Sequence, residues 1–313
     1  MERVFIVSAA RSAIGNFGGS LATCTPAELG RIVADEVLSR ASNPNIKERV
    51  DEVIVGNVLG AGHGMNIARQ VALGVGLSVS TPAYTVNKVC GSGLKSVTLG
   101  AASIASGEAS VILAGGVESM SQAGFVSLSS RWGARLGHAE LRDLILQDGL
   151  TDVFNSCHMG ITAENLAEKY DISRADQDAF ALESQRKAAL AASEGRFDRE
   201  IAAVPLFKKG KQIGEFCKDE YPRETTLEAL SNLKPAFKKD GSVTAGNASG
   251  INDGAAFVLL ASEKVVQEMG LTVLAEIDCW ASAGVEPEFM GIGPVNAVKK
   301  LVDKSKVSLS SVD

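Results

Sequence analysis

The sequence predicts an α/β fold built in layers, with a loop-rich subdomain inserted into it. Two observations favour this class. Short, continuously apolar runs alternate with segments of helical periodicity, a pattern typical of sheets that helices cover on both faces. From about residue 121 to residue 244 this alternation gives way to glycine-rich loops and one long helix. The alternation argues against a β-sandwich, in which strands follow one another directly.

The composition bounds the class of protein. A chain of 313 residues with 45% apolar residues can bury a substantial core, and it is long enough for one large α/β domain or two modest ones. No apolar run approaches the roughly 20 residues of a membrane span. The formal charge of −6 argues against nucleic acid as a partner. The five cysteines, an odd number without a CxxC pair, argue against a disulfide scaffold and a zinc site, so we expect a cytoplasmic protein without a metal.

The elements expected before residue 121 alternate strictly. The chain opens with the β-branched run RVFIVSAARSAIG, which predicts a strand followed by a glycine-bearing loop. A helix follows at 25–41, with Thr25 as its N-cap and Pro26 at its first helical position. Its apolar stripe consists of Leu29, Ile32, Val33, Val37 and Leu38. The later elements are a strand in 50–60, a helix in 66–77, a strand in 81–87, a helix in 91–108 and a strand in 110–120.

The elements after residue 120 follow a different pattern. A long helix is expected at 173–195, where Ser173 caps the first turn and Asp176 follows three residues later. The run LFKKGKQIGEF predicts a hairpin with exposed lysines. Alternation resumes with a buried strand at 253–262 and a helix that ends at Gly270. The expected domains are residues 1–120 plus 245–270 as an N-terminal α/β domain, residues 121–244 as the inserted subdomain, and residues 271–313 as the start of a C-terminal α/β domain.

A weak internal repeat relates the last residues to the first. TVLAEIDCWASAG at 272–284 parallels the opening strand, and GPVNAVKKLVDKS at 293–305 parallels the first helix. Residues 310–313 then parallel the lead into the strand at 50–60. A second half that stops before its own central strand leaves an apolar sheet edge exposed. We therefore expect a truncated second half. Either a segment of a partner completes it, or the chain is a fragment.

Cys90 lies within the run TVNKVCGSGLKSV. A free cysteine is most often inert packing, and a disulfide partner, a metal ligand and a nucleophile are the alternatives. Here a strand gives way to a helix, and the field of a helix N-terminus stabilises thiolate over thiol. Gly91 and Gly93 allow backbone amides to approach a bound oxygen closely. A sharp turn between strand and helix also exposes the nucleophile of many hydrolases, so these features favour a nucleophile.

The chain resembles the thiolases, the acyl-CoA acyltransferases, along essentially its whole length. The nucleophile region of that family is similar to VNKVCGSGLKSV followed by ILAGGVESMS. The resemblance continues in order through DGLTDVF, CHMGITAENLA, SRADQDAFALESQ, GRFDREI, LKPAF, VTAGNASGINDGAA and FMGIGPV. Among thiolases, the triplet His158-Met159-Gly160 resembles the biosynthetic acetoacetyl-CoA type. The resemblance implies a thiolase-like fold of α-β-α-β-α layers.

The resemblance also implies an activity, that of an acetyl-CoA C-acetyltransferase. Such an enzyme condenses two molecules of acetyl-CoA to acetoacetyl-CoA and CoA, with Cys90 carrying the acetyl group as a thioester and its backbone N–H serving an oxyanion hole. No cofactor is implied, because the coenzyme A thioester is the substrate. The residues implied to contact the substrate are Leu150, His158, Met159, Arg223, Ser249 and Met290. On chemistry alone, His158 is also a possible base for Cys90.

The resemblance further implies the binding partners, and it shows that three motifs of the family are missing from this sequence. Residues 129–138 match the oligomerisation region of the family, so we expect a homo-oligomer, a dimer or a homotetramer, with neither nucleic acid nor membrane as a partner. Three family turns have no counterpart here: Asn-Glu-Ala-Phe, a Gly-His-Pro turn whose histidine assists the nucleophile, and a Cys-Gly-Gly-Gly-type turn with a second catalytic cysteine. Cys217 and Cys279 do not match the last of these. We therefore expect this chain alone to be inactive in turnover.

Other functions fit parts of the same pattern. A 3-ketoacyl-CoA thiolase of fatty-acid degradation shares most of these motifs. A fragment that keeps the fold and binds CoA without catalysis is a second alternative. A ketoacyl synthase relative fits the nucleophile turn but not the run VTAGNASG.

Overall fold

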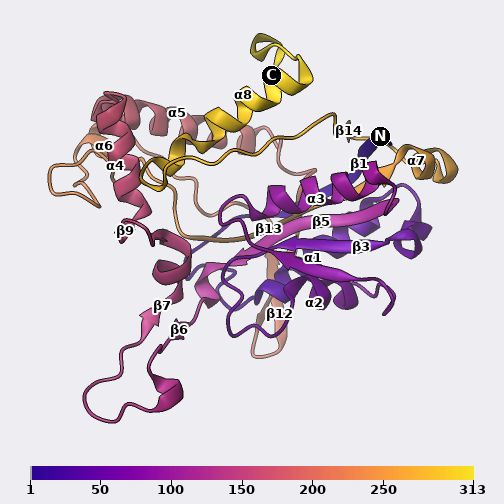
Figure 1. Ribbon diagram of the computed structural model, residues 1–313, viewed down its shortest axis with the longest axis horizontal. Helices are drawn as coiled ribbons and strands as arrows, with labels where there is room; N and C mark the ends of the chain where they lie inside the picture. The colour runs from indigo at the N-terminus through magenta and orange to yellow at the C-terminus, as the bar shows by residue number, and fades with distance from the viewer. Residues whose placement is uncertain (1) are drawn as a thin grey trace. The chain divides into compact units, whose positions relative to one another are not determined.

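The structure, a computed structural model, describes residues 2–313. The chain forms two compact units (Figure 1). The first unit holds the residues up to Gly149 together with Asp198–Tyr221 and Ile251–Ile277. The second unit holds Leu150–Phe197, Pro222–Gly250 and Asp278–Asp313. Among the described residues, no helix combines the length and the apolarity that a membrane span requires.

An eight-stranded sheet organises the first unit. Its strands are β1 (Val4–Ser12), β2 (Gly15–Asn16), β3 (Glu52–Gly56), β4 (Ala83–Val86), β5 (Val111–Ser119), β10 (Ile201–Ala202), β13 (Asn252–Ser262) and β14 (Ala275–Glu276). The path runs β10, β1, β13, β5, β3, β4, with β14 also paired to β1 and β2 also paired to β13. β13 is antiparallel to both β1 and β5, whereas β3 is parallel to both β5 and β4.

Helices cover both faces of this sheet (Figure 1). They are α1 (Pro26–Arg40), α2 (Ile67–Gly74), α3 (Ser92–Ser106) and α7 (Glu263–Met269). α1 and α2 share one core cluster with Leu113 of β5. α3 lies on the opposite face, where a β-carbon added at Gly100 would contact Ile112 of β5 and Leu260 of β13. Successive residues of β5 therefore serve opposite faces, which explains why this strand is apolar throughout.

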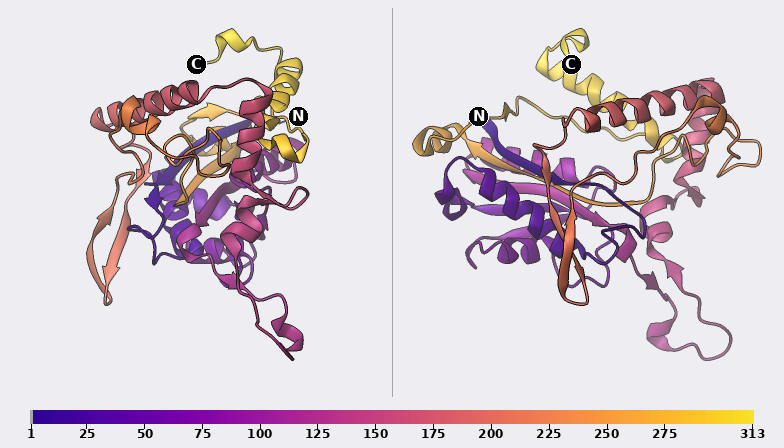
Figure 2. Two further views of the ribbon diagram at one scale, coloured as in Figure 1. Left: turned by 90° about the vertical axis from the view of Figure 1, so that its left-hand side faces the viewer. Right: turned by 180° about the vertical axis from the view of Figure 1, so that it is seen from behind.

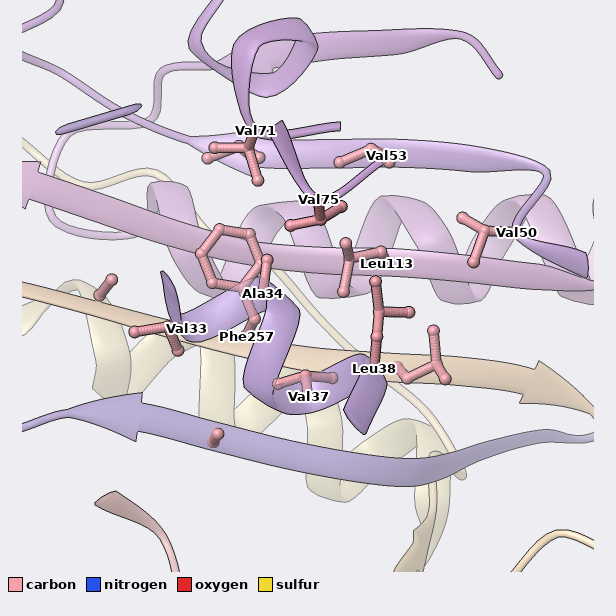
Figure 3. Close-up of a cluster of buried hydrophobic side chains, with 14 of the residues drawn as sticks. Val33, Ala34, Val37, Leu38, Val50, Val53, Val71, Val75, Leu113 and Phe257 are labelled. Atoms are coloured by element: carbon pink, nitrogen blue, oxygen red, sulfur yellow. The ribbon is translucent and has the colours of Figure 1, made fainter. Parts of the chain in front are cut away.

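The core beneath α1 explains the predicted apolar stripe of that helix. Figure 3 shows Val33 and Val37 of α1 in the same cluster as Phe257 of β13. Leu29, Val33 and Val37 are fully buried, and Ile32 at the margin of the stripe is partly buried. Burying one such side chain completely contributes about 1.5–3 kcal/mol. The stripe is thus the main attachment of α1 to the sheet.

Local signals place several helix ends and turns as the sequence predicts. Thr25 and Glu28 form a reciprocal capping box at the start of α1. α7 ends at Gly270, whose φ of 62° lies in the left-handed region that favours glycine. The predicted hairpin forms from β11 (Val204–Lys208) and β12 (Lys211–Phe216), and its lysines are exposed. These predictions are confirmed.

Helices and short strands make up the second unit (Figure 2). β8 (Thr151–Asp152) and β9 (Cys157–His158) pair antiparallel and lead into α4 (Met159–Lys169). The long helix α5 (Arg174–Ser193) begins with the predicted capping box of Ser173 and Asp176. The remaining elements are α6 (Leu227–Ser231), the 3-10 turn η5 (Pro287–Ile292), α8 (Gly293–Ser305) and a last 3-10 turn at Leu309–Ser311.

The segment at 272–284 differs from the strand that the internal repeat predicts. Only the two residues of β14 are in a strand, and they pair antiparallel with β1, at Phe5 and Ile6. β14 pairs with the side of β1 that β13 leaves open, and the strand is short because the residues after Ile277 belong to the second unit. The repeat-related helix does form, as α8.

The compact units also differ from the expected domain boundaries. Residues 198–221, which the sequence groups with the insertion, belong to the first unit because β10 pairs in parallel with β1. Residues 121–149 belong to the first unit as well. A role of residues 121–244 in CoA binding and oligomerisation stays a prediction.

Candidate active site

Cys90 lies in the turn that joins β4 to α3, and it is exposed. β4 ends at Val86 and α3 begins at Ser92, so five residues make the connection. The predicted turn between strand and helix is therefore confirmed. Burial as inert packing, the commonest state of a free cysteine, does not apply to this sulfur.

Ser92 holds the turn together from inside. Its side chain is buried, and its Oγ accepts the N–H of Lys88 at 2.8 Å while donating to the carbonyl oxygen of Val89 at 2.6 Å. The N–H of Val89 donates to Oδ1 of Asn87 at 2.9 Å. These bonds fix the backbone on the N-terminal side of Cys90. The sequence analysis gave Ser92 no role.

Val89 has a φ of 49°, in the left-handed region. A β-branched residue there is a genuine outlier, and such strain costs about 1–3 kcal/mol. The contacts of Ser92 hold this conformation in place. The residue before the exposed sulfur therefore carries the strain of the turn.

Two glycines of the sheet let α3 approach it directly. A β-carbon at Gly56 of β3 would overlap the backbone of Ser92 and Gly93. A β-carbon at Gly116 of β5 would lie 3.0 Å from the Cα of Gly93. A β-carbon at Gly93 itself would lie 3.8 Å from the Cα of Gly116, an ordinary contact, so the expected role of Gly93 beside a bound oxygen stays a prediction. The N-terminus of α3 thus rests on β3 and β5.

Glu118 anchors a second loop at the same edge of the sheet. It accepts the N–H groups of Val58 and Leu59, each at 2.9 Å, and Nδ2 of Asn57 at 3.0 Å. Burial raises the pKa of the Glu118 carboxyl, and the two backbone hydrogen bonds oppose that rise. Because β3, β4 and β5 are parallel, the loops after them meet at their shared carboxyl edge, together with Cys90.

The other four cysteines are also free; Cys24, Cys157 and Cys279 are partly buried, whereas Cys217 is exposed like Cys90. Burial, with the charges of Glu28 and Asp253, raises the pKa of the Cys24 thiol to about 12. Burial and the neighbouring Asp278 also raise the pKa of Cys279. Both residues are therefore held as thiols, which agrees with not assigning Cys279 a catalytic role.

The six predicted substrate-contacting residues all lie in the second unit. Arg223, Ser249 and Met290 are exposed, and Leu150, His158 and Met159 are partly buried. Met290 lies in η5, which packs against α4 through Lys169, whose Nζ is 3.7 Å from the ring centre of Phe289. Leu150 precedes Thr151, the residue paired with His158. Leu150, His158, Met159 and Met290 are thus grouped around α4.

His158 has a defined orientation at the start of α4. Its Nδ1 accepts the N–H of Gly160 at 2.9 Å, so the side chain caps the helix. Its ring stacks on Phe237, with centroids 4.7 Å apart and planes 18° from parallel. Phe237 lies in the run LKPAF, but the sequence analysis did not select it as a site residue.

Two buried carboxylates anchor the loop that carries Ser249. Glu164 of α4 accepts the N–H of Val243 at 2.8 Å. Asp178 of α5 accepts Nδ2 of Asn247 at 2.9 Å. Glu164 and Asp178 are 5% and 3% exposed, so these bonds are shielded from water. The sequence gave no signal for either residue.

Arg223 is connected to the same loop. Its guanidinium donates to the carbonyl oxygen of Ala245 at 2.8 Å, and its N–H donates to Oε1 of Gln185 at 3.0 Å. The loop, Arg223 and α5 therefore form one hydrogen-bonded group within the second unit.

The sequence of the chain matches known proteins over its full length. A family model described as "Thiolase, N-terminal domain" matches residues 4–264. An acetyl-CoA acetyltransferase of Pseudomonas aeruginosa is 54% identical over 315 residues, covering 100% of this chain and 79% of that protein. A probable acetyl-CoA acyltransferase of Staphylococcus aureus is 50% identical over 316 residues, again covering 100% of this chain and 79% of that protein.

Solved structures match the fold equally well. The crystal structure of the Bacillus anthracis acetyl-CoA acetyltransferase has a TM-score of 0.96 and 43% identity, covering 100% of this chain and 79% of that one. Human mitochondrial 3-ketoacyl-CoA thiolase has a TM-score of 0.93 and 43% identity, covering 100% and 78%. The predicted thiolase-like fold is confirmed. This chain belongs to the thiolase family.

Proposed function

We propose that the chain has the fold and the nucleophile of an acetyl-CoA C-acetyltransferase, an enzyme that reversibly condenses two acetyl-CoA to acetoacetyl-CoA and CoA through an acyl-enzyme. We propose that Cys90 forms this acyl-enzyme. The observation that carries the proposal is the exposed Cys90 sulfur on a turn that Ser92 and the glycines of the sheet hold fixed. The 54% identity to a protein named acetyl-CoA acetyltransferase supports the choice of substrate.

The first half-reaction is a thiol exchange. The Cys90 thiolate attacks the carbonyl carbon of acetyl-CoA, the bond from that carbon to the CoA sulfur breaks, and CoA leaves as its thiolate. The product is an acetyl thioester on Cys90, which remains activated for a second attack. The N–H of Cys90 is the expected donor to the oxyanion. No cofactor takes part in this step.

The second half-reaction needs a base. A proton leaves the methyl carbon of a second acetyl-CoA, and the resulting carbanion attacks the Cys90 thioester and displaces the Cys90 thiolate. The Gly-His-Pro and Cys-Gly-Gly-Gly-type turns of the family are not found within residues 1–313. We therefore propose that the 313-residue chain forms the acyl-enzyme but does not complete the condensation.

Mass spectrometry tests the first half-reaction. Incubation with acetyl-CoA should add one acetyl group to the chain, and peptide mapping should place it on Cys90. Cys90→Ser should abolish this modification, whereas Cys217→Ser, a change at another exposed cysteine, should retain it. An unmodified Cys90 in a chain that binds CoA would favour the non-catalytic CoA-binding reading. Robust thiolysis of acetoacetyl-CoA would contradict the proposed lack of turnover.

A second candidate is the 3-ketoacyl-CoA thiolase of fatty-acid degradation. The TM-score of 0.93 with the human mitochondrial enzyme of that name supports it. The two candidates differ in the acyl chain that Cys90 accepts. Acylation of Cys90 by octanoyl-CoA as fast as by acetyl-CoA would favour this candidate.

A homo-oligomer, a dimer or a homotetramer, is proposed for the assembled protein in the cytoplasm. The supporting observation is the arm between β6 (Phe125–Val126) and β7 (Arg142–Asp143) (Figure 1). Large apolar side chains of this arm are exposed. They are Leu128, Trp132, Leu136 and Leu141. Light scattering after size exclusion measures the mass, and Trp132→Ser should lower it towards that of a smaller assembly.

A further inference from the structure

Both ends of the turn that carries Cys90 are fixed to the sheet. At the first end, the carbonyl oxygen of Val86 in β4 accepts the N–H of Asn57 at 3.1 Å. At the other end, the backbone of Ser92 lies directly against Gly56 of β3. A rotation within a short connection whose ends are fixed has to be absorbed by the residues between those ends. The position of Cys90 therefore depends on the backbone conformation of the turn.

Val89 is the strained residue of this turn. Its φ of 49° lies in the left-handed region, where a β-branched side chain is an outlier. Such a conformation persists only where the surrounding contacts over-determine it. The side chain of Val89 is 43% exposed, so its own packing is a weak constraint. The contacts that hold the conformation are therefore those made to its backbone.

Two polar side chains make these contacts. Oδ1 of Asn87 accepts the N–H of Val89 at 2.9 Å, the pattern of an Asx turn, in which an asparagine bonds to the backbone two residues later. The carbonyl oxygen of Val89 accepts both the hydroxyl and the N–H of Ser92, at 2.6 and 3.0 Å. The same hydroxyl accepts the N–H of Lys88 at 2.8 Å. Asn87 and Ser92 thus pair both backbone polar groups of Val89.

The two contacts lie in different surroundings. Ser92 is only 4% exposed, so its hydrogen bonds are shielded from water and act in a medium of low dielectric constant. Asn87 is exposed, and its bond to Val89 competes with water. Both side chains flank Cys90 in the sequence without being part of the sulfur's own chemistry. They can influence Cys90 only through the backbone of the turn.

We propose that Asn87 and Ser92 are positioning residues for the Cys90 nucleophile, which act by holding Val89 in its left-handed conformation. Without either side chain, Val89 relaxes towards the extended region that β-branched residues favour, and the fixed ends of the turn transmit this rotation to Cys90. The thioester as the group that Cys90 attacks rests on the proposed function. The conformation of Val89 and its contacts rest on the structure alone.

Crystal structures of the full chain and two variants test the conformation without any substrate. We expect a positive φ at Val89 in the unmodified chain and a negative φ in Ser92→Ala. Asn87→Ala, a change at an exposed position that leaves the core intact, should give the same result. A negative φ at Val89 in the unmodified chain would overturn the proposal. A positive φ that persists in one of the variants would show that its side chain does not position Val89.

The rate at which acetyl-CoA acetylates Cys90, followed by mass spectrometry of the intact chain, tests the consequence. Ser92→Ala and Asn87→Ala should each lower this rate by about tenfold, the value of one hydrogen bond. Asn87→Ser, whose hydroxyl can accept the same N–H, should recover part of the loss. Ser106→Ala, at an exposed serine in the last turn of α3, is the matched control and should keep the full rate. Full rates in both Ser92→Ala and Asn87→Ala would contradict the positioning role.

A double variant separates positioning through Val89 from a general structural role of Ser92. Asparagine adopts the left-handed region readily, so Val89→Asn removes the need to hold residue 89 in place. In the Val89→Asn background, Ser92→Ala should lower the acetylation rate by less than about twofold, compared with about tenfold beside Val89. Val307→Asn, at a valine with the same exposure of 43%, should leave the tenfold loss intact. Equal losses beside Val89 and Asn at position 89 would show that Ser92 does not act through this residue.

Acetylation of the unmodified chain tests the proposed function separately. If acetyl-CoA did not modify Cys90 in that chain, the proposed function would fail, and with it the thioester as the partner of Cys90. The φ of Val89 in the crystal structures would still confirm or overturn the roles of Asn87 and Ser92.

Discussion

The helices α1 and α8 begin from related sequences and lie in opposite environments. Both start with a proline in the first helical positions, and both carry apolar residues at helical spacing. Leu29 and Val33 of α1 are fully buried, whereas Val295 and Val298 of α8 are 44% and 38% exposed. Local signals are therefore enough to form the helix, but burial of its stripe needs the face of a sheet.

The strands that precede the two helices also differ in how far they are paired and buried. β1 has nine residues and pairs with β13, β10 and β14. The related segment at 272–284 contributes only the two residues of β14, and its Val273 and Leu274 are 42% and 60% exposed. A sheet that continues on both sides of β1 provides the surface on which α1 is buried.

The largest effect is expected from truncating the buried stripe of α1. Val33→Ala removes two carbons from a fully buried position, so the free energy of unfolding should fall by about 2–3 kcal/mol. Val298→Ala makes the same change on α8, where we expect a change within about 0.5 kcal/mol. Urea unfolding followed by circular dichroism measures both. Equal losses would show that the stripe of α8 is as well buried as that of α1.

A smaller effect is expected in the segment that follows β1. Arg11 donates to both oxygens of Asp219, at 2.8 and 3.1 Å, and the N–H of Ile14 donates to Oδ1 at 2.7 Å. Burial alone would raise the pKa of Asp219, but these hydrogen bonds and the charge of Arg11 hold it below its ordinary value. A carboxyl with a lowered pKa stabilises the fold above its unfolded-state pKa, and this stability is lost as the pH falls through the folded-state value.

Asp219→Asn should therefore lower the free energy of unfolding by about 1–2 kcal/mol at pH 7. The difference in unfolding free energy between Asp219→Asn and the unmodified chain should shrink on acidification below about pH 4, where the carboxyl of the unfolded chain takes up a proton. Thermal unfolding at a series of pH values measures this, with Asp240→Asn at an exposed position as the control. Parallel profiles of Asp219→Asn and the unmodified chain would contradict the assignment.

The smallest effect concerns how the two helices begin. Thr25 caps α1 with its side chain, whereas the N-cap of α8, Ile292, makes no side-chain cap hydrogen bond. Thr25→Ala should cost about 1 kcal/mol of stability, and Thr25→Ser, which keeps the hydroxyl, should cost little. Urea unfolding again measures the difference. A loss for Thr25→Ser as large as that for Thr25→Ala would mean that the methyl group, and not the cap, matters.

Features that depend on neighbouring residues could be predicted from the sequence. The capping boxes at Thr25 and Ser173 join residues three positions apart, and Gly270 ends α7 through its own backbone conformation. The exposed turn at Cys90 follows from a strand, a short run of small residues and a helix. The roles of Cys90 and of the six substrate-contacting residues came from the family resemblance, and they stay predictions.

Features that join distant segments could not be predicted in this way. Glu164 accepts the N–H of Val243, 79 residues later in the chain, and no local pattern relates the two. The left-handed conformation of Val89 even contradicts the local preference of a β-branched residue. Likewise, the repeat predicted a strand at 272–284, but only β14 pairs with β1, and the residues after Ile277 belong to the second unit. In each case a contact from elsewhere in the fold determined the outcome.

The direct contact of α3 with Gly56 and Gly116 has a consequence for protein engineering. A library that randomises these two positions should return almost only glycine, because every other side chain would lift the helix from the sheet and shift the Cys90 turn with it. Variants that accept bulkier acyl groups therefore have to be selected at other positions of the chain.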